Sequence, residues 1–552
     1  MSSLWEVAKR IRNCRTSTKS TPSYSESWIE EFADRICPPF APNNVDFTSF
    51  SSPANEKLCD FFKLKELNLA LSQCDNSAPG LDGVKFLVLK QLPIEAKQFM
   101  VELFSELVQV GSIPEDWYKV KTVAVVKPNK DPCEQESYRP ICMLSCFRKA
   151  LERMILNRLD IWAERGNILS PTQYGFRKGK GTRDCLALLA SNIQLTFAKK
   201  EELIAVFLDI QGAYDSVLID LLFEKLIKLK IPIKLAKFIY NLMAVKEMNF
   251  YFNNSLRITR TSNYGLPQGS CLSPFLYNVY VSEIDTCIDD KCTLVQLADD
   301  GVVWCTGKDP REMQLYLQSS LNYLSNWAKS LNLTFSSRKT EFIVFSNKHV
   351  PSSVELKLNN QLLPRTVLAK YLGIYFDSKC RWRVHIDYLR RKCAQRINFM
   401  KMITGSWWGA HPDSLITLYK TTVRSVIEYG SHVFGSAAKS HLDKLERLQN
   451  RCLRIALGCM TSTHTRSLEV MCGIPSLPTR FQELECRFLI NCFQQNHPIV
   501  TVLDKIFELK PGSRYLYNYR LCITLELINP PQKNYFHFEI ESICHVPYVD
   551  TA

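Results

Sequence analysis

Two adjacent carboxylates, Asp299 and Asp300, are the most informative chemical feature of the chain. An apolar run leads into the pair, Gly301 follows it, and a second apolar run leads out. An Asp-Gly step between two such runs is typical of a β-hairpin. We therefore expect a hairpin over residues 294–304, with both acids at its tip and pointing away from the core.

A third acid, Asp209, ends the apolar strand expected over residues 203–209. An Asp-Asp-Gly turn alone is more often a plain hairpin, and a lone strand-end aspartate is more often a cap. Carboxylates gathered on neighbouring strand ends, however, repel one another unless a cation or proton intervenes, and they form a hard oxygen site for divalent cations. Two such cations suit an in-line phosphoryl displacement. The three acids together predict nucleotidyl transfer.

Other segments could bind phosphates. The loop around Gly265 and Gln268 precedes an apolar helix expected over residues 275–284, whose free N–H groups suit an anion. Lys127 and Arg139 lie at turn positions beside a strand, within reach of a triphosphate. Each of these features alone is more often an ordinary loop or a surface charge.

Two basic segments favour a nucleic-acid backbone. The glycine-rich loop 175–183 carries Arg177, Lys178, Lys180 and Arg183. The helical segment 379–401 has eight basic residues and one acid, among them Arg390, Arg391 and Lys392. A solvated loop or helix face is the competing interpretation, and for the helical run we favour binding.

Composition limits the class of protein. With 552 residues, 46% apolar and 22% charged residues, the chain is an ordinary globular protein of about three to four domains. The net charge of +14 favours an anionic partner. No segment reads as a signal peptide or membrane helix. The 21 cysteines show no disulfide or zinc spacing, so we expect reduced thiols in the nucleus and cytoplasm.

The elements that must position these residues alternate between helix and strand up to about residue 384. We expect helices over 147–165 and 311–331, strands over 120–126 and 341–345, and a hairpin turning at Asn359-Asn360. From about residue 385 the spacing predicts helices alone, and one of them ends at Gly458.

Eight motifs follow one another in a recognisable order. They are Ser77–Gly83, Lys127-Pro128 with Tyr138–Ile141, Gln173–Arg177, Phe207–Asp215, Gly265–Ser270, Ala298–Asp300, Ser337–Glu341 and Tyr371–Ile374. In this order the chain resembles the reverse transcriptases of non-LTR retrotransposons over roughly residues 60–480, and the helical stretch 442–458 looks like that of insect-type elements.

The resemblance implies an α+β right-hand polymerase with fingers, a palm built on an antiparallel sheet, a helical thumb and a C-terminal helical region. On this basis we expect a linker over 1–55, fingers with part of the palm over 56–200, the palm with the catalytic hairpin and primer grip over 201–384, and the thumb and downstream region over 385–500. Residues 501–552 carry no assignment.

The resemblance also implies roles for individual residues. The catalytic set is Asp209, Asp299, Asp300 and Lys339, and the three aspartates with Ile210 hold the metals. The nucleotide site is implied to comprise Lys127, Arg139, Gln211, Gly212, Ala213, Tyr214 and Gln268, and the primer grip Tyr371, Leu372 and Gly373. Tyr214 matches the aromatic residue that excludes a 2′-hydroxyl. Leu297 stands where the family usually has Tyr or Phe beside the primer end.

The expected function is therefore RNA-directed DNA polymerase, with two Mg²⁺ or Mn²⁺ ions, an RNA template, a DNA primer and deoxynucleoside triphosphates. We expect no membrane partner and an endonuclease either upstream of this sequence or acting in trans. The main alternative is a decayed or co-opted relative that binds RNA without copying it, although all three acids are present. Tyr214 argues against an RNA-dependent RNA polymerase, and a structural basic protein leaves the ordered motifs unexplained.

Overall fold

The computed structural model describes residues 24–38, 45, 47, 56–128, 130–252, 255–349, 352–405, 409–509, 520, 521 and 524. Most of the expected linker over 1–55 and most of the unassigned segment 501–552 lie outside these residues. The chain divides into two compact units. Unit 1 comprises Met1–Cys185, Leu203–Val344 and Val350–Leu372; unit 2 comprises Leu186–Glu202, Phe345–His349 and Gly373–Ala552.

Helices of unit 1 surround its core. They are α2 (Glu26–Ile36), α3 (Leu64–Gln73), α4 (Phe86–Gln91), α5 (Ile94–Val110), α6 (Cys146–Arg165), α8 (Ile219–Lys228), α9 (Ile233–Ala244), α10 (Ser273–Tyr280) and α11 (Pro310–Ser330). The helices predicted over 147–165 and 311–331 are confirmed as α6 and α11. Both begin at a side-chain cap, Ser145 and Asp309, which binds a free backbone N–H of the first turn. The helix predicted over 275–284 is shorter and ends at Tyr280.

A four-stranded mixed sheet carries the N-terminal part of unit 1. Its order is β2-β1-β4-β5, from β1 (Lys119–Val126), β2 (Tyr138–Met143), β4 (Lys246–Phe252) and β5 (Ser255–Ser262). Strand β1 is antiparallel to β2 and parallel to β4. Buried side chains of α2, among them Phe32, pack in one apolar cluster with side chains of β1, β2 and β4. Helix α2 lies within the range expected to be a linker, yet it is docked on this sheet.

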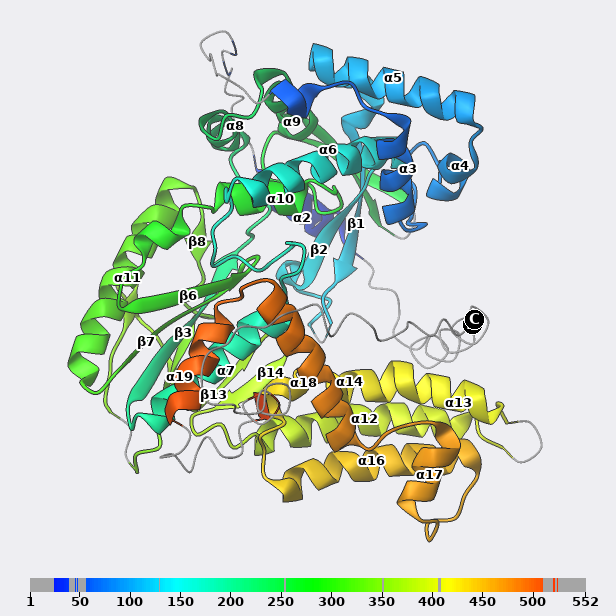
Figure 1. Ribbon diagram of the computed structural model, residues 1–552. Coiled ribbons are helices and arrows are strands. Elements are labelled where there is room, and N and C mark those ends of the chain that lie inside the picture. Colours follow the sequence, from blue (N-terminus) through cyan, green and yellow to red (C-terminus); the bar gives the residue numbers. More distant parts are fainter. Residues whose placement is uncertain are drawn as a thin grey trace. The chain divides into compact units, whose positions relative to one another are not determined.

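A second mixed sheet carries the acids. It contains β3 (Glu202–Gln211), β6 (Cys292–Leu297), β7 (Asp300–Gly307), β9 (Glu341–Phe345) and β12 (Arg365–Thr366) in the order β12-β9-β3-β7-β6, and β8 (Thr334–Phe335) pairs with β3. Residues 203–208 of β3 are all buried, which explains the continuous apolar run in its sequence. Helix α11 runs along β6 and β7 and contacts both strands (Figure 1). Mixed helices and sheets confirm the α+β class at this level.

Two short hairpins complete the strands. Strands β10 (Lys357–Leu358) and β11 (Gln361–Leu362) pair antiparallel and turn at Asn359 and Asn360, as predicted. Both asparagines have positive φ, 51° and 61°, which asparagine tolerates in such turns. Strands β13 (Leu368–Tyr371) and β14 (Ile374–Asp377) form a second two-stranded sheet.

Unit 2 is almost entirely helical, as predicted from residue 385 onward. Besides most of α7 (Thr182–Ala198), its helices are α12 (Arg383–Met402), α13 (Pro412–Leu418), α14 (Ser425–Glu428), α15 (Ser431–Phe434), α16 (Lys439–Leu457), α17 (Thr465–Cys472), α18 (Leu477–Gln494) and α19 (Ile499–Leu509). Helices α12, α13 and α16 pack side by side (Figure 1). The predicted end of α16 at Gly458 is confirmed, because that glycine has φ 65°.

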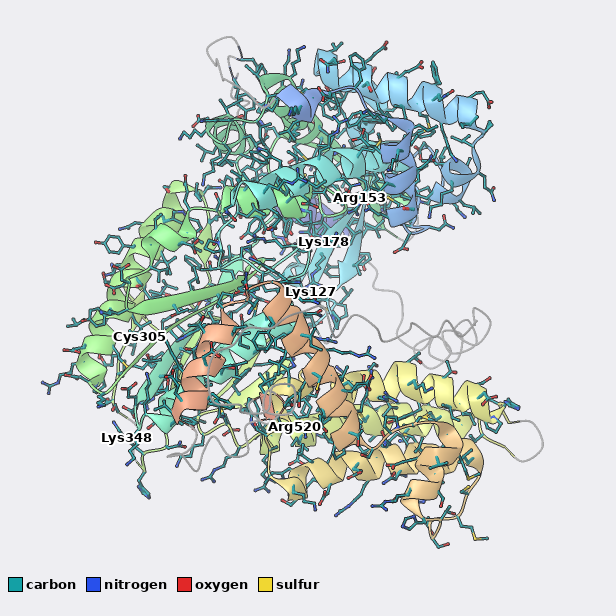
Figure 2. All side chains as sticks on the ribbon, in the orientation of Figure 1. Lys127, Arg153, Lys178, Cys305, Lys348 and Arg520 are labelled. Atoms are coloured by element: carbon teal, nitrogen blue, oxygen red, sulfur yellow. The ribbon has the colours of Figure 1, made fainter. Side chains whose placement is uncertain are left out.

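The C-terminal part of unit 2 was not predicted. Helix α19 buries Ile499, Leu503 and Ile506, a helical spacing that the sequence does contain. Beyond it, the Arg520 guanidinium donates to both carboxylate oxygens of the fully buried Glu485, at 2.7 and 3.0 Å (Figure 2). Among the described residues, no helix combines the length and apolar character that a membrane span needs.

Candidate active site

The predicted hairpin is present, but its turn falls two residues earlier than expected. Leu297 pairs with Asp300 across β6 and β7, so the two turn residues are Ala298 and Asp299. The turn at Asp300-Gly301 that the sequence suggested is therefore wrong, because Gly301 lies within β7 opposite Gln296. Asp299 stands at the tip, and Asp300 begins the outgoing strand. Ala298 takes the left-handed conformation, with φ 59°.

The side chain of Gln173 holds this turn. Its Oε1 accepts the N–H groups of Ala298 and Gly175, each at 2.8 Å, and its Nε2 donates to the Ala298 carbonyl at 3.2 Å. A Cβ on Gly175 would lie 2.3 Å from the Ala298 nitrogen, so only glycine allows the two backbones to approach this closely. Asn278 donates to the Gly175 carbonyl at 2.8 Å from the other side. These contacts explain the Gln173–Arg177 motif better than phosphate binding does.

The third acid, Asp209, lies near the end of β3, the neighbour of β7 in the sheet. Its carboxylate pairs with Lys339 Nζ at 3.1 Å. Its carbonyl accepts the N–H of Ser336 at 2.8 Å, and the N–H of Lys339 donates to the Ser336 carbonyl at 3.2 Å. The structure thus brings Asp209, Asp299, Asp300 and Lys339 together, and their catalytic role stays a prediction.

The electrostatics of the acids suit a bound cation. Asp299 and Asp300 open to solvent on one side, but protein atoms crowd them elsewhere. The pKa of Asp300 is raised to about 6, chiefly by desolvation and then by the charges of Asp299 and Asp209, against the opposing charge of Lys339. Desolvation and Asp209 likewise raise the pKa of Asp299, against the opposing charges of Arg139 and Lys339. A divalent cation would relieve this repulsion.

The predicted nucleotide side begins where β3 ends. Gln211 and Gly212 are exposed, Gly212 has φ 54°, and Ala213 is buried. The next residue, Tyr214, stacks on the fully buried Tyr277, with ring centroids 5.2 Å apart. Burial and the charge of Asp299 raise the pKa of Tyr214, which places its ring beside the acids.

Gln268 is held by a residue that the sequence analysis did not assign. Its Nε2 donates to Asp215 Oδ1 at 3.1 Å, and its carbonyl accepts the N–H of Cys142 at 2.9 Å. A Cβ on Gly265 would lie 2.9 Å from the Asp215 backbone, so this glycine is needed for close approach. Asp215, Gln268 and the buried Lys246 are among the residues that line a small recess.

A buried ion pair on α6 binds the loop that carries Gln268. Arg148 and Glu152 on α6 are 1% and 0% exposed, and their side chains meet at 2.8 Å. The other oxygen of Glu152 accepts from the Ser270 hydroxyl at 2.7 Å and from the Cys271 N–H at 2.8 Å. The spacing of four positions places Arg148 and Glu152 on one face of α6, but the helix carries other charged residues, so the sequence does not single out this pair.

Lys127 and Arg139 lie where β1 ends and β2 begins. Lys127 follows β1, and its Nζ donates to the Glu136 carbonyl at 2.7 Å (Figure 2). Arg139 is exposed and pairs in register with Val125. Burial lowers the pKa of Lys127, and the positive charges of Lys339, Arg139 and Arg35 lower it further. Lys339, Arg139 and Arg35 therefore lie close enough to Lys127 to act on its charge.

The basic loop 175–183 divides into two kinds of residue. The Arg177 side chain is 6% exposed, pairs with Glu164 at 2.7 Å and donates to the Ser170 carbonyl at 2.7 Å. Its donors thus support the loop rather than face a phosphate. Lys180 lies over the Tyr174 ring at 5.4 Å, whereas Lys178 and Arg183 are exposed.

The remaining predicted residues lie on two further elements. Tyr371 at the end of β13 is buried against Phe207, with ring centroids 5.3 Å apart. Leu372 and Gly373 follow with φ of 44° and 84°, the left-handed pair of a tight hairpin turn. In unit 2, Arg390, Arg391 and Lys392 are exposed on α12.

Comparison with known proteins agrees with this geometry. Residues 126–376 match the family described as reverse transcriptase (RNA-dependent DNA polymerase). The chain is 28% identical over 515 residues to the RNA-directed DNA polymerase from mobile element jockey of Drosophila melanogaster, covering 88% of this chain and 56% of the relative. It is 32% identical over 396 residues to the probable RNA-directed DNA polymerase from transposon BS of the same species, covering 69% and 43%.

A third relative, the probable RNA-directed DNA polymerase from transposon X-element of Drosophila melanogaster, is 25% identical over 479 residues, covering 83% of this chain and 52% of the relative. The matched range includes Asp209, Asp299, Asp300 and Lys339. The resemblance to the reverse transcriptases of insect non-LTR elements is confirmed. The chain spans about half the length of these curated relatives.

Proposed function

We propose that this chain is an RNA-directed DNA polymerase that extends a DNA primer on an RNA template with deoxynucleoside triphosphates. One observation carries the proposal: Asp209, Asp299 and Asp300 converge beside Lys339 within the domain that matches reverse transcriptases. Three mutually repelling carboxylates at strand ends have no evident value for stability, so they favour a catalytic site.

We propose that the chain has the fingers, palm and thumb organisation of a right-hand polymerase. The fingers with part of the palm comprise residues 56–200, the palm residues 201–384, and the thumb with the downstream region residues 385–500. Helix α2 is an addition to the fingers, since it packs with β1, β2 and β4 in one core. Endonuclease activity is proposed to come from a segment upstream of this sequence or from another protein.

Asp209, Asp299 and Asp300, with the Ile210 carbonyl, would hold two Mg²⁺ or Mn²⁺ ions. The raised pKa values of Asp299 and Asp300, and the oxygen donors of the whole set, fit hard divalent cations. When bound, such ions activate the primer hydroxyl and offset the charge that develops on the phosphoryl group. Lys339 orients the Asp209 carboxylate and donates to the leaving pyrophosphate.

The other residues position substrates. Lys127 and Arg139 bind the triphosphate, the segment Gln211–Ala213 lies against the nucleotide, and Tyr214 excludes a ribose 2′-hydroxyl. Gln268, oriented by Asp215, lines the base and sugar pocket. Tyr371, Leu372 and Gly373 support the primer end. Residues proposed to contact nucleic-acid phosphates are Lys178, Lys180, Arg183, Arg390, Arg391 and Lys392, with Arg177 as a support of its loop.

Primer extension on an RNA template, with Mg²⁺ and separately with Mn²⁺, tests the proposal. Asp209→Asn and Asp299→Asn should each abolish extension, because each removes a charge required for metal binding, while template–primer affinity and thermal midpoint stay near wild type. Asp290→Asn, an exposed aspartate preceding β6, is the matched control and should extend normally. A wild-type chain that binds template but extends nothing would instead favour the co-opted RNA-binding alternative.

A further inference from the structure

Helix α2 is fixed on the four-stranded sheet by contacts along its length. Trp28 donates from its indole to the Cys133 carbonyl at 3.1 Å and stacks on Phe32 with centroids 5.4 Å apart. Phe32 is fully buried and meets Phe250 of β4 edge-on at 6.0 Å. Near the end of the helix, Asp34 pairs with Arg260 of β5 at 2.9 Å. The last turn of α2 therefore has a defined position on unit 1.

That last turn carries Arg35 beside Lys127. Arg35 Nη2 donates to the Gln135 carbonyl at 2.8 Å, and Lys127 Nζ donates to the next carbonyl, that of Glu136, at 2.7 Å. Two cations are thus bound to adjacent carbonyls of one short turn, Gln135–Ser137. Each uses only part of its donor capacity in this contact, since a guanidinium has five N–H donors and an ammonium three.

The charges around this turn are predominantly positive. Arg139 and Lys339 act on Lys127 together with Arg35, and all three lower the pKa of its ammonium group. Two carboxylates oppose them: Glu136 on the turn itself and Asp215, which faces both Arg35 and Lys127 and also accepts from Gln268. Because Arg35, Lys127 and Arg139 outnumber these two carboxylates, a further anion would be attracted to this turn.

We propose that Arg35 of α2 is a further binding residue for the triphosphate of the incoming nucleotide, acting beside Lys127 and Arg139. The inference rests on the proposed polymerase function and adds a contact from an N-terminal helix outside the matched domain. A guanidinium fits two phosphate oxygens at once, whereas the neighbouring ammonium acts as a point charge. A triphosphate supplies enough oxygens to bind all three cations.

Binding of inorganic tripolyphosphate to the full chain tests the contact without catalysis. The rise in the thermal midpoint with tripolyphosphate concentration measures this binding. Arg35→Gln should weaken tripolyphosphate binding about tenfold, the loss typical of one charge-assisted contact. In primer extension the same variant should raise KM for each deoxynucleotide by a similar factor, with kcat and template–primer affinity unchanged. Arg35→Lys keeps the positive charge but loses the two-pronged guanidinium. Its affinity for tripolyphosphate should therefore lie between those of wild type and Arg35→Gln.

Two controls separate binding from folding. Arg260→Gln removes the ion pair to Asp34 and leaves Arg35 in place, whereas Arg311→Gln removes an exposed charge at the start of α11. Unchanged tripolyphosphate binding in Arg35→Gln overturns the inference, and so does an equal loss in Arg260→Gln, which would mean that α2 docking alone matters. If tripolyphosphate binding depends on Arg35 but no primer is extended, the polymerase proposal fails while the anion site stands.

Discussion

At the scale of single residues, the position of Asp299 depends on a neighbour in an unfavourable backbone conformation. Ala298 has φ 59°, and an L-residue in this region costs roughly 1–2 kcal/mol. Three hydrogen bonds from Gln173 to Ala298 and Gly175 offset that cost. Strain retained at the tip of a hairpin that carries two acids is consistent with a site selected for geometry rather than stability.

Tyr214 is expected to control the choice of sugar. Its ring stacks on Tyr277 near Asp299, and under the proposed function it would contact the sugar of a nucleotide bound at the acids. Replacing Tyr214 with Ala should reduce the preference for deoxyribonucleotides over ribonucleotides by roughly 10–100-fold, the range over which pocket volume rejects an added hydroxyl. Single-nucleotide incorporation of each deoxyribonucleotide and of the matching ribonucleotide measures this ratio.

Tyr214→Phe is the matched control for this substitution. It keeps the ring and the stacking on Tyr277, so its sugar preference should match that of the wild type. If Tyr214→Ala and wild type discriminate equally well, the ring does not contact the sugar.

At the scale of elements, the loop that carries Gln173 binds the turn of the hairpin that carries Asp299 and Asp300. Gln173→Ala would leave the N–H and carbonyl of Ala298 without their partner, and the hairpin turn would lose its fixed geometry. We expect kcat for primer extension to fall about 10–100-fold, because misplacing a catalytic group by about 1 Å has this order of effect. Template–primer affinity should stay within a few-fold of wild type.

Gln318→Ala provides a closely matched control for Gln173→Ala. Gln318 bridges the N–H and carbonyl of Lys357 in the same two-sided way, at 2.8 and 2.9 Å, but it joins α11 to β10 and not to the acids. Its loss should leave kcat unchanged. Equal activity of Gln173→Ala and wild type would mean that the turn is held by β6 and β7 alone.

Helix α12 contains a buried histidine that should make unit 2 sensitive to acid. His385 is 1% exposed, and burial, with a further contribution from Lys392, lowers its pKa to about 4 from 6.5. Between pH 6.5 and about 4 the unfolded chain takes up a proton that the folded chain resists. The contribution of the neutral His385 to the free energy of unfolding is therefore fully present above pH 6.5. It falls by roughly 3 kcal/mol as the pH drops through this window.

Thermal unfolding of wild type and His385→Phe at pH 7.5 and pH 5 tests this sign. The phenylalanine variant cannot take up the proton, so its midpoint should fall less between the two pH values than that of wild type. His464→Gln, which alters an exposed histidine, should behave like wild type. An identical fall in His385→Phe would assign the acid sensitivity to other groups.

At the scale of the whole molecule, the net charge of +14 favours binding to an anionic polymer. The exposed run on α12 is the proposed source of part of that affinity. Replacing Arg390, Arg391 and Lys392 together with Ala should reduce the slope of log affinity against log salt by roughly 2–3, since each lost phosphate contact removes about 0.7–0.9. Titration of a fluorescent RNA–DNA duplex at several salt concentrations measures the slope.

A triple alanine variant at Lys439, Arg447 and Arg451, exposed on α16 in the same unit, is the control for total charge. It removes the same number of charges and should change the slope little. Equal slopes for the two triple variants would mean that binding responds to net charge and not to the α12 run.

Local sequence patterns predicted most of the elements around the acids. Apolar runs predicted β3 and the β6–β7 hairpin, helical spacing predicted α6, α11 and the helical character of unit 2, and Gly458 marked a helix end. These features depend on local periodicity and turn chemistry, which neighbouring residues specify. The order of the eight motifs then led to the reverse transcriptase family, which the comparisons bear out.

Several side chains that complete the site could be recognised only from the tertiary structure. The turn moved to Ala298-Asp299 because Gln173, more than a hundred residues earlier in the chain, binds Ala298. Arg177 was expected to grip a phosphate but is committed to Glu164, whereas Asp215 and Arg35 carried no assignment and lie beside Gln268 and Lys127. Contacts between distant segments leave no local periodicity, so the sequence alone could not reveal them.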